Sequence, residues 1–211
     1  MDPITSVPTV TSQSGYHHGD LRNALLEASE RLLAKTGVAA LSLREVAKQA
    51  GVSHAAPYRH FKGKAALMSG LAQSGFGRLQ IAIRMAADKI SYDPEQKLIE
   101  AGVAYVHLAL GHPALMQLMF SAAPGQGVDR ELRQAAMATL DPLVDIINTG
   151  IEAGVFRDRD AHELALVAWT SMHGLAMLLV ARLMETDMAD KKSLDGLVRS
   201  MMQNVIYGIS R

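Results

Sequence analysis

The sequence contains no cysteine, few aromatic residues and no excess of charge of either sign. Among 211 residues, aromatic side chains make up 5%, and 21 Lys and Arg balance 21 Asp and Glu. The absence of cysteine excludes disulfides, thiolate metal sites and thiol catalysis, and it favours a cytoplasmic location. Residues 1–15 lack the basic start and the apolar run of a signal peptide, so we expect them to form a disordered tail.

What the sequence does contain favours helices. Apolar residues make up 49% of the chain, twelve residues are Met, and clusters of β-branched residues are rare. This composition predicts an all-α protein of about nine helices. The longest apolar stretch, 164–181, has the character of a membrane span at first sight, but it contains His173 and polar neighbours. We interpret it as a buried or interface helix and expect no membrane partner.

The spacing of apolar residues and the capping residues predict individual helices. The expected helices are 21–36, 43–50, a short one from 53, 64–89, 93–111, 113–121, 129–153, 160–185 and 194–209, with a loop at 121–128. N-caps are predicted at Asp20, Ser42, Ser53, Asp93 and Asp160. Gly37 and Gly51 are expected to end helices, and Pro142 to kink one near residues 139 and 140.

The sequence Ala50-Gly51-Val52-Ser53 joins two short helices after a longer one. This is the spacing of a helix-turn-helix, whose turn often contains glycine. Between residues 41 and 64 there are five basic residues and one acidic residue, so an anionic partner is a reasonable expectation. An αα-corner with no nucleic acid has the same spacing and remains an alternative.

The stretch GVSHAAPYRHF places a proline inside the second short helix. Counted from Ser53, Pro57 is the fourth residue of the helix, so one hydrogen bond is lost and the opening turn is expected to tighten towards 3₁₀ geometry. Beyond it, Tyr58, His60 and Lys64 are donors suited to phosphate oxygens. A half-buried Tyr58 and His60 that satisfy each other are the alternative, and Phe61 is the expected core anchor.

These residues resemble the DNA-binding domain of the TetR family of transcriptional repressors. The resemblance runs from residue 16 to about 72 and rests on Gly-Val-Ser at the turn, Tyr-x-His-Phe at 58–61 and the following Lys64. It departs at Pro57, where Leu or Ile is commoner. Further along, HPALMQLMF at 112–120 and AWTSMHGLAML at 168–178 are similar to a subgroup with a W-x-x-x-H-G motif, met here by Trp169, His173 and Gly174.

The resemblance implies a helix-turn-helix domain at 16–64 and a helical ligand-binding and dimerisation domain at 65–211. It implies contact with double-stranded DNA, with His54, Ala55 and Ala56 facing base edges in the major groove. The full set of expected DNA-binding residues is Ser42, Arg44, Lys48, Ser53, His54, Ala55, Ala56, Tyr58, Arg59, His60 and Lys64.

The larger domain has Met and aromatic residues on helices that must pack together, which is typical of an adaptable apolar cavity. Plain core filling remains an alternative for each residue. The expected pocket residues are Tyr105, Met116, Met119, Phe120, Met137, Trp169, Met172 and His173. No paired carboxylates, nucleophile motif or phosphate loop occurs, so we expect neither an enzyme nor a cofactor. His17, His18 and Asp20 could suggest a metal site, but we interpret them as solvated or close to DNA.

The last two predicted helices, 160–185 and 194–209, have apolar faces too extensive for the surface of a monomer. We therefore expect a homodimer through these helices, with Gly174 permitting close approach, bound to a palindromic operator. The resemblance implies a repressor that a small apolar or amphipathic effector releases by moving the helix 64–89. A helical carrier of hydrophobic molecules without operator binding is the alternative.

Overall fold

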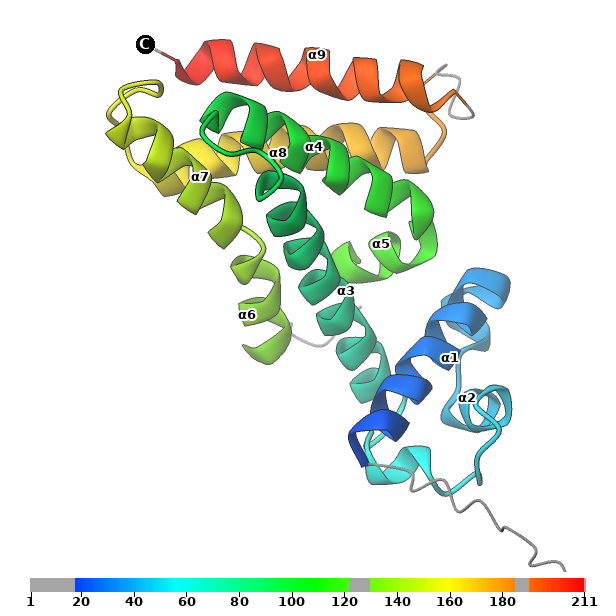
Figure 1. Ribbon diagram of the computed structural model, residues 1–211. Coiled ribbons are helices and arrows are strands. Elements are labelled where there is room, and N and C mark those ends of the chain that lie inside the picture. Colours follow the sequence, from blue (N-terminus) through cyan, green and yellow to red (C-terminus); the bar gives the residue numbers. More distant parts are fainter. Residues whose placement is uncertain (1–17, 122–129, 185–189, 211) are drawn as a thin grey trace, which may run out of the picture.

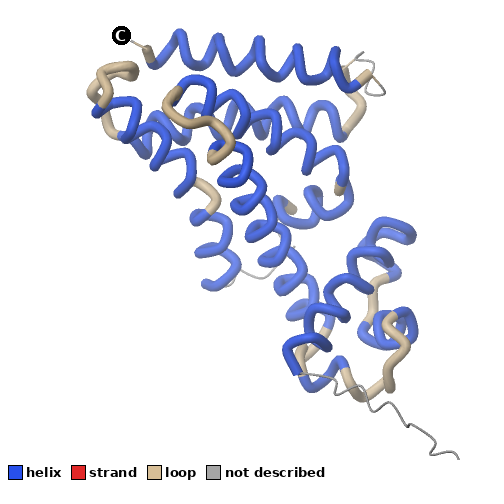
Figure 2. The backbone as a smooth tube through the Cα atoms, in the orientation of Figure 1, coloured by secondary structure: helices blue, strands red, loops and turns tan. Residues whose placement is uncertain are grey.

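The computed structural model describes residues 18–121, 130–184 and 190–210, and these residues form an all-α fold, as predicted. Figure 2 shows helices joined by short loops, with no strand among the described residues. The predicted tail at 1–15, His17 and nearly all of the predicted loop at 121–128 lie outside them. Among the described residues, no group of His, Asp or Glu has an arrangement that could hold a metal ion.

The first two helices form a small module with a capped turn. They are α1 (His18–Ala40) and α2 (Leu43–Gln49). Helix α1 begins before Asp20, so the prediction of Asp20 as its N-cap was wrong. Near its other end, α1 is interrupted at Gly37, whose φ is 73°. The Ser42 hydroxyl accepts the Glu45 N–H at 3.2 Å, and Gly51 has a φ of 69°, which confirms the predicted start and end of α2.

The predicted α-helix from Ser53 is wrong. A turn at 54–56 leads into a 3₁₀-helix, η1 (Pro57–Arg59). Pro57 has no N–H to donate to the Ser53 carbonyl, which instead accepts from Ala56 at 3.0 Å, so the turn closes one residue early. The 3₁₀ geometry that the sequence predicts for the opening turn therefore extends over the whole of η1.

Replacing Pro57 with leucine is expected to restore an N–H that can donate to the Ser53 carbonyl. One hydrogen bond gained, less the greater flexibility of the unfolded chain, should raise the free energy of unfolding by about 0.5 kcal/mol. The melting temperature should rise by about 1–2 °C, with more negative ellipticity at 222 nm. An unchanged spectrum would mean that the turn, and not the proline, imposes the 3₁₀ geometry.

The remaining helices build the rest of the described fold (Figure 1). They are α3 (Lys64–Ala87), α4 (Pro94–Gly111), α5 (Pro113–Phe120), α6 (Arg130–Ala138), α7 (Asp141–Glu152), α8 (Ala161–Val180) and α9 (Lys191–Ile209). The N-caps Asp93 and Asp160 are confirmed, since each accepts backbone N–H groups through its side chain. The predicted single helix at 129–153 is wrong. Two helices, α6 and α7, stand in its place, since the chain leaves helical geometry before Pro142 and is not merely kinked there.

Helix α3 extends from the small module into the larger one, where it packs mainly on α4. Helix α5 turns back from α4 by 103°, and its far side meets α1. Helices α4, α7 and α9 pack against α8, which among the described helices has by itself the length and apolar composition of a membrane span. In the structure α8 therefore has helical partners within this chain.

Candidate nucleic-acid interface and effector site

The DNA-binding residues expected from the sequence lie on one small module, and each is at least partly exposed. They come from α2, the turn after Gly51, η1 and the first residue of α3. The helix-turn-helix packing places the basic side chains of Arg44, Lys48 and Arg59 in solvent, while Val46 and Ala47 on the other face of α2 are fully buried. The module therefore presents an exposed basic surface on a buried apolar support.

Two aromatic residues of η1 and its flank have opposite environments. Tyr58 is 61% exposed, which does not match the alternative of a half-buried pair with His60. Phe61 is buried, and the Arg22 guanidinium lies 5.5 Å from its ring centroid, so Phe61 is the predicted core anchor. Lys64 donates through Nζ to the carbonyl oxygen of Ala39 at 3.1 Å, so in this structure its ammonium fastens the end of α1.

Most of the expected pocket residues come together as a packed aromatic cluster. The Phe120 ring centroid lies 4.1 Å from that of His173 and 6.1 Å from that of Trp169. The Trp169 and His173 rings stack at 5.5 Å with an interplanar angle of 15°. Because they are four residues apart on α8, they share one helix face. We call Tyr105, Phe120, Trp169 and His173 the aromatic cluster.

The methionines of the expected pocket differ in burial. Met116, Met119 and Met172 are buried in the same apolar core as the aromatic cluster. Met137 is not: it lies on α6 with 59% of its surface exposed, so its assignment to the pocket was wrong. The helical period of 129–153 could not reveal this, because the break at residues 139–140 reorients α6 relative to α7.

The aromatic cluster contains a polar pair. The Tyr105 hydroxyl and Nδ1 of His173 are hydrogen-bonded at 2.9 Å. Burial raises the pKa of Tyr105, and the neighbouring Trp169 N–H lowers it to a smaller extent. Burial also lowers the pKa of His173. Both side chains are therefore uncharged at neutral pH.

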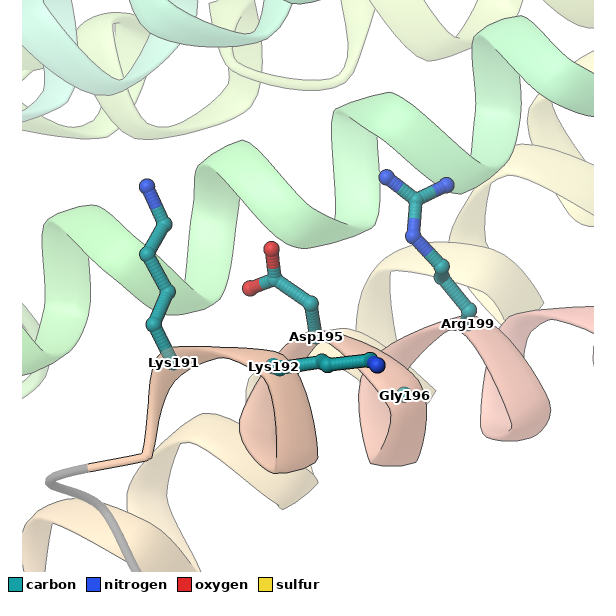
Figure 3. A pocket seen from close by; sticks show the side chains of 5 residues that line it. All are labelled: Lys191, Lys192, Asp195, Gly196 and Arg199. Carbon is teal, nitrogen blue, oxygen red and sulfur yellow. The ribbon is translucent and has the colours of Figure 1, made fainter.

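Two surface hollows lie away from the aromatic cluster. One of about 580 Å³ follows α9 along Lys191, Lys192, Asp195, Gly196 and Arg199 (Figure 3), and another of about 110 Å³ lies between α3, α4 and α7. The first has the charged lining of a surface groove. At the expected apolar pocket the rings of Phe120, Trp169 and His173 pack against one another, so a ligand that enters between them has to displace them.

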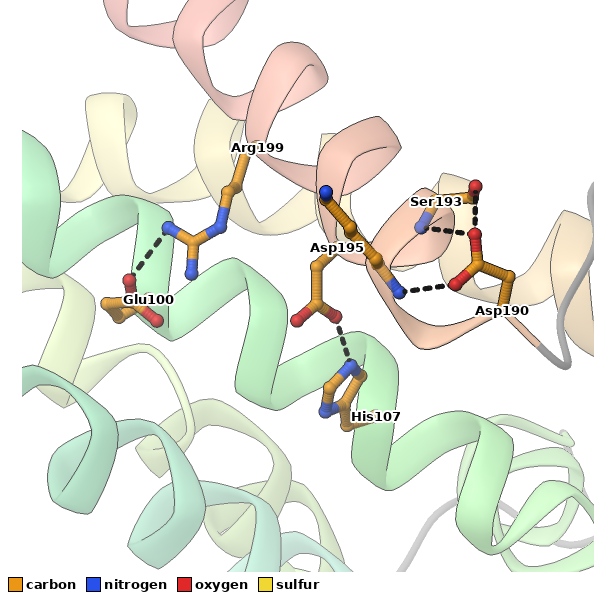
Figure 4. Close-up of polar contacts among 7 residues, drawn as sticks. Glu100, His107, Asp190, Ser193, Asp195 and Arg199 are labelled. Atoms are coloured by element: carbon orange, nitrogen blue, oxygen red, sulfur yellow. Dashed lines mark hydrogen bonds and ion pairs between the residues drawn. The ribbon is translucent and has the colours of Figure 1, made fainter.

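Ion pairs fasten α9 to α4 (Figure 4). Arg199 donates to Glu100 at 2.8 Å, and His107 lies 2.6 Å from Asp195. The hydrogen bond from Arg199 lowers the pKa of Glu100, and Glu100 in turn raises the pKa of Arg199. These pairs hold the last helix in position on the larger domain.

A charged contact that the sequence analysis missed joins the two parts of the chain. Glu30 on α1 meets Arg78 on α3 at 2.9 Å, and its other oxygen meets Nδ1 of His112 at 2.7 Å, at the α4–α5 corner. We call these three residues the α1 clamp. They are widely separated in the sequence and belong to no motif, so no local signal could have found them.

Comparison with known proteins agrees with this architecture. Residues 25–71 match the family model described as bacterial regulatory proteins, tetR family, and residues 98–204 match the tetracyclin repressor-like C-terminal domain. The helical fold with an N-terminal helix-turn-helix module is therefore that of this family. The chain belongs to the tetR family. The W-x-x-x-H-G subgroup assignment stays a prediction.

Individual relatives span the chain to different extents. A solved structure of a protein with unknown function from Rhodococcus sp. RHA1 is 35% identical and covers 94% of this chain and all of its own, with a TM-score of 0.80. FadR from Bacillus subtilis, solved in complex with stearoyl-CoA, is 18% identical with a TM-score of 0.72, over 89% of this chain and 98% of its own, and shows the fold alone.

Curated relatives match shorter segments. The HTH-type transcriptional regulator AcrR of Shigella flexneri is 40% identical over 65 residues, 29% of this chain and 30% of its own. An uncharacterized HTH-type regulator of Mycobacterium tuberculosis is 28% identical over 118 residues, 55% of this chain and 57% of its own. This chain therefore covers less than two thirds of the length of these relatives.

Proposed function

We propose that this protein is a ligand-responsive, sequence-specific DNA-binding regulator, most simply a cytoplasmic repressor that a small apolar or amphipathic effector releases from its operator. The observation that supports this most strongly is the exposed basic surface on α2, the following turn and η1. Arg44, Lys48 and Arg59 have their charges in solvent there, where they can meet phosphates without loss of any protein contact.

In this proposal residues 16–64 act as the DNA-binding domain and residues 65–211 as the ligand-binding and dimerisation domain. His54 and the short side chains of Ala55 and Ala56 would face base edges from the turn. Two alanines offer methyl contacts, suited to thymine, but no hydrogen bonds. Phosphate contacts therefore supply most of the affinity, and Tyr58 and His60 are the aromatic donors among them.

The protein would act as a homodimer through α8 and α9. Helix α8 exposes a stripe of Val167, Gly174 and Leu178, which are seven and eleven residues apart and so share a face. A Cβ built at Gly174 would meet nothing within 4 Å in this chain, so a helix of a second copy can approach closely there. Two-fold symmetry then matches a palindromic operator.

The effector would act on two links between the domains. Helix α3 is the continuous link, and the α1 clamp is the second, at the α4–α5 corner that leads to Phe120. A ligand that displaces Phe120 moves α5, which packs on α1. The separation of the two DNA-binding modules in the dimer would change, and the affinity for successive major grooves would fall.

Footprinting on DNA flanking the gene, at several salt concentrations, tests this function. A protected palindrome is expected, with affinity falling about 1,000-fold between 50 and 200 mM salt. Lys48→Ala should reduce the slope of log K against log salt by about one for each protomer. Lys89→Ala, which removes an exposed charge at the far end of α3, is the matched control and should leave the slope unchanged. A protein that binds hydrophobic molecules but protects no DNA would be a carrier instead.

A further inference from the structure

The single tryptophan of this chain carries a buried donor with no well-aligned hydrogen-bond acceptor among the described residues. Trp169 is partly buried, and its Nε1 atom is shielded from solvent. The Tyr105 hydroxyl lies close enough for the indole N–H to lower its pKa, but the two groups do not meet the geometry of a hydrogen bond. A buried N–H without an acceptor is costly, since the folded state loses the hydrogen bond that water supplies to the unfolded chain. A ligand that supplies an acceptor to this donor would remove that cost.

The geometry around the indole fixes where that donor lies. Trp169 stacks on His173, and the His173 ring is held by the Tyr105 hydroxyl through Nδ1. Phe120 lies against both the imidazole and the indole. The indole N–H, the Tyr105 hydroxyl and Nδ1 of His173 therefore form a small polar centre within apolar side chains.

The surroundings of this centre carry no formal charge. Phe120 meets Phe76 edge to face at 5.2 Å, and Met172, next to His173 in the chain, is fully buried. None of the ion pairs formed by the described residues includes a member of the aromatic cluster. An anionic group placed here would lose its hydration without gaining a countercharge, whereas a neutral oxygen would lose little.

We propose that the aromatic cluster is the head-group site for an uncharged, mainly apolar molecule with a carbonyl or ether oxygen, which accepts a hydrogen bond from the Trp169 N–H. Tyr105 is a positioning residue, because it acts on the ligand by orienting His173, on which the indole stacks. Phe120 is displaced by the apolar part of the ligand. This inference rests on the proposed function in taking the ligand as the effector, but binding itself can be measured without DNA.

Three matched series of probes test the chemistry. Methyl ketones of six to twelve carbons, alkanes of the same lengths and fatty carboxylates of the same lengths are titrated against the full chain. Binding is followed by thermal shift and by the emission of the single tryptophan. At least one ketone is expected to bind at least tenfold more tightly than its alkane and its carboxylate and to shift the emission, because the indole N–H gains an acceptor.

Variants separate the hydrogen bond from apolar packing. Trp169→Phe keeps an aromatic ring without the N–H and should reduce the ratio of ketone to alkane affinity to near one, measured by thermal shift. Its melting temperature should fall, because the smaller ring packs less well against Phe120 and His173, so ketone and alkane affinities are compared within the variant. Tyr105→Phe leaves the indole intact and should weaken ketone binding about tenfold. Tyr92→Phe removes an exposed hydroxyl elsewhere and should change nothing.

Four results would overturn the inference: no ketone binds, the alkanes bind as tightly as the ketones, the carboxylates bind more tightly, or Trp169→Phe retains the preference for ketones. These results are separate from the test of function. A footprint without ketone binding leaves the regulator in place and removes this site. Ketone binding that leaves the DNA complex intact supports the site and contradicts release by this effector.

Discussion

Gly150→Ala is expected to lower the free energy of unfolding by about 3 kcal/mol. Gly150 lies on α7, and a Cβ built there falls well inside van der Waals contact with the ring of Phe156. Phe156 is fully buried, and its N–H donates to the Gly150 carbonyl at 3.1 Å, so neither the ring nor the turn can move aside cheaply. The melting temperature should fall by about 6–12 °C in a thermal unfolding curve followed by circular dichroism.

The consequence should reach the end of α9. Next to Phe156, Arg157 donates through its backbone N–H to Ile209 at 2.9 Å and through Nε to Ser210 at 2.8 Å. A shifted turn would therefore release the last residues of the expected dimer helix. We expect faster hydrogen exchange at residues 205–209 in Gly150→Ala than in the wild type.

Gly77→Ala is the matched control. Gly77 lies inside α3, and a Cβ there would meet nothing within 4 Å. Alanine in a helix interior should raise the free energy of unfolding by about 0.5–1 kcal/mol. If both variants were equally stable, Phe156 would not pack against Gly150 in solution.

Leu178→Glu is expected to convert the proposed homodimer into monomers and to lower affinity for the proposed operator by at least about 100-fold. Leu178 is 45% exposed on α8, on the stripe that contains Val167 and Gly174. A carboxylate there would be buried against its symmetry mate without a partner. A monomer then loses the gain in affinity from two linked DNA-binding modules, which is about 10²–10⁴ in such systems. Light scattering after gel filtration gives the mass, and a footprint titration gives the affinity.

Ile81→Glu controls for the added charge. Ile81 is 57% exposed on α3, away from α8 and α9. This variant should stay a dimer with unchanged affinity. A dimer that survives Leu178→Glu would place the interface on another face, and a dimer lost in both variants would point to a general effect of charge.

Local signals sufficed for much of the fold because they act over a few residues. The Ser42 cap, the left-handed Gly51 and the Asp93 and Asp160 caps depend on neighbours two or three positions away. The prediction for Asp20 failed because α1 begins before it. The α-helix expected from Ser53 does not form, because Pro57 changes the hydrogen bonding of the whole element and not of one residue alone.

The sequence alone determined the all-α class, the helix-turn-helix spacing with its basic residues, and the helix face that carries Trp169 and His173. Each is a property of composition or of a period of a few residues. Only the tertiary structure decided that Met137 lies outside the aromatic cluster, that the rings of the cluster pack against one another, and that the buried Trp169 donor lacks a well-aligned acceptor. The tertiary structure also brought together the three residues of the α1 clamp. Contacts between residues so far apart in the sequence depend on how the helices pack, which no local pattern encodes.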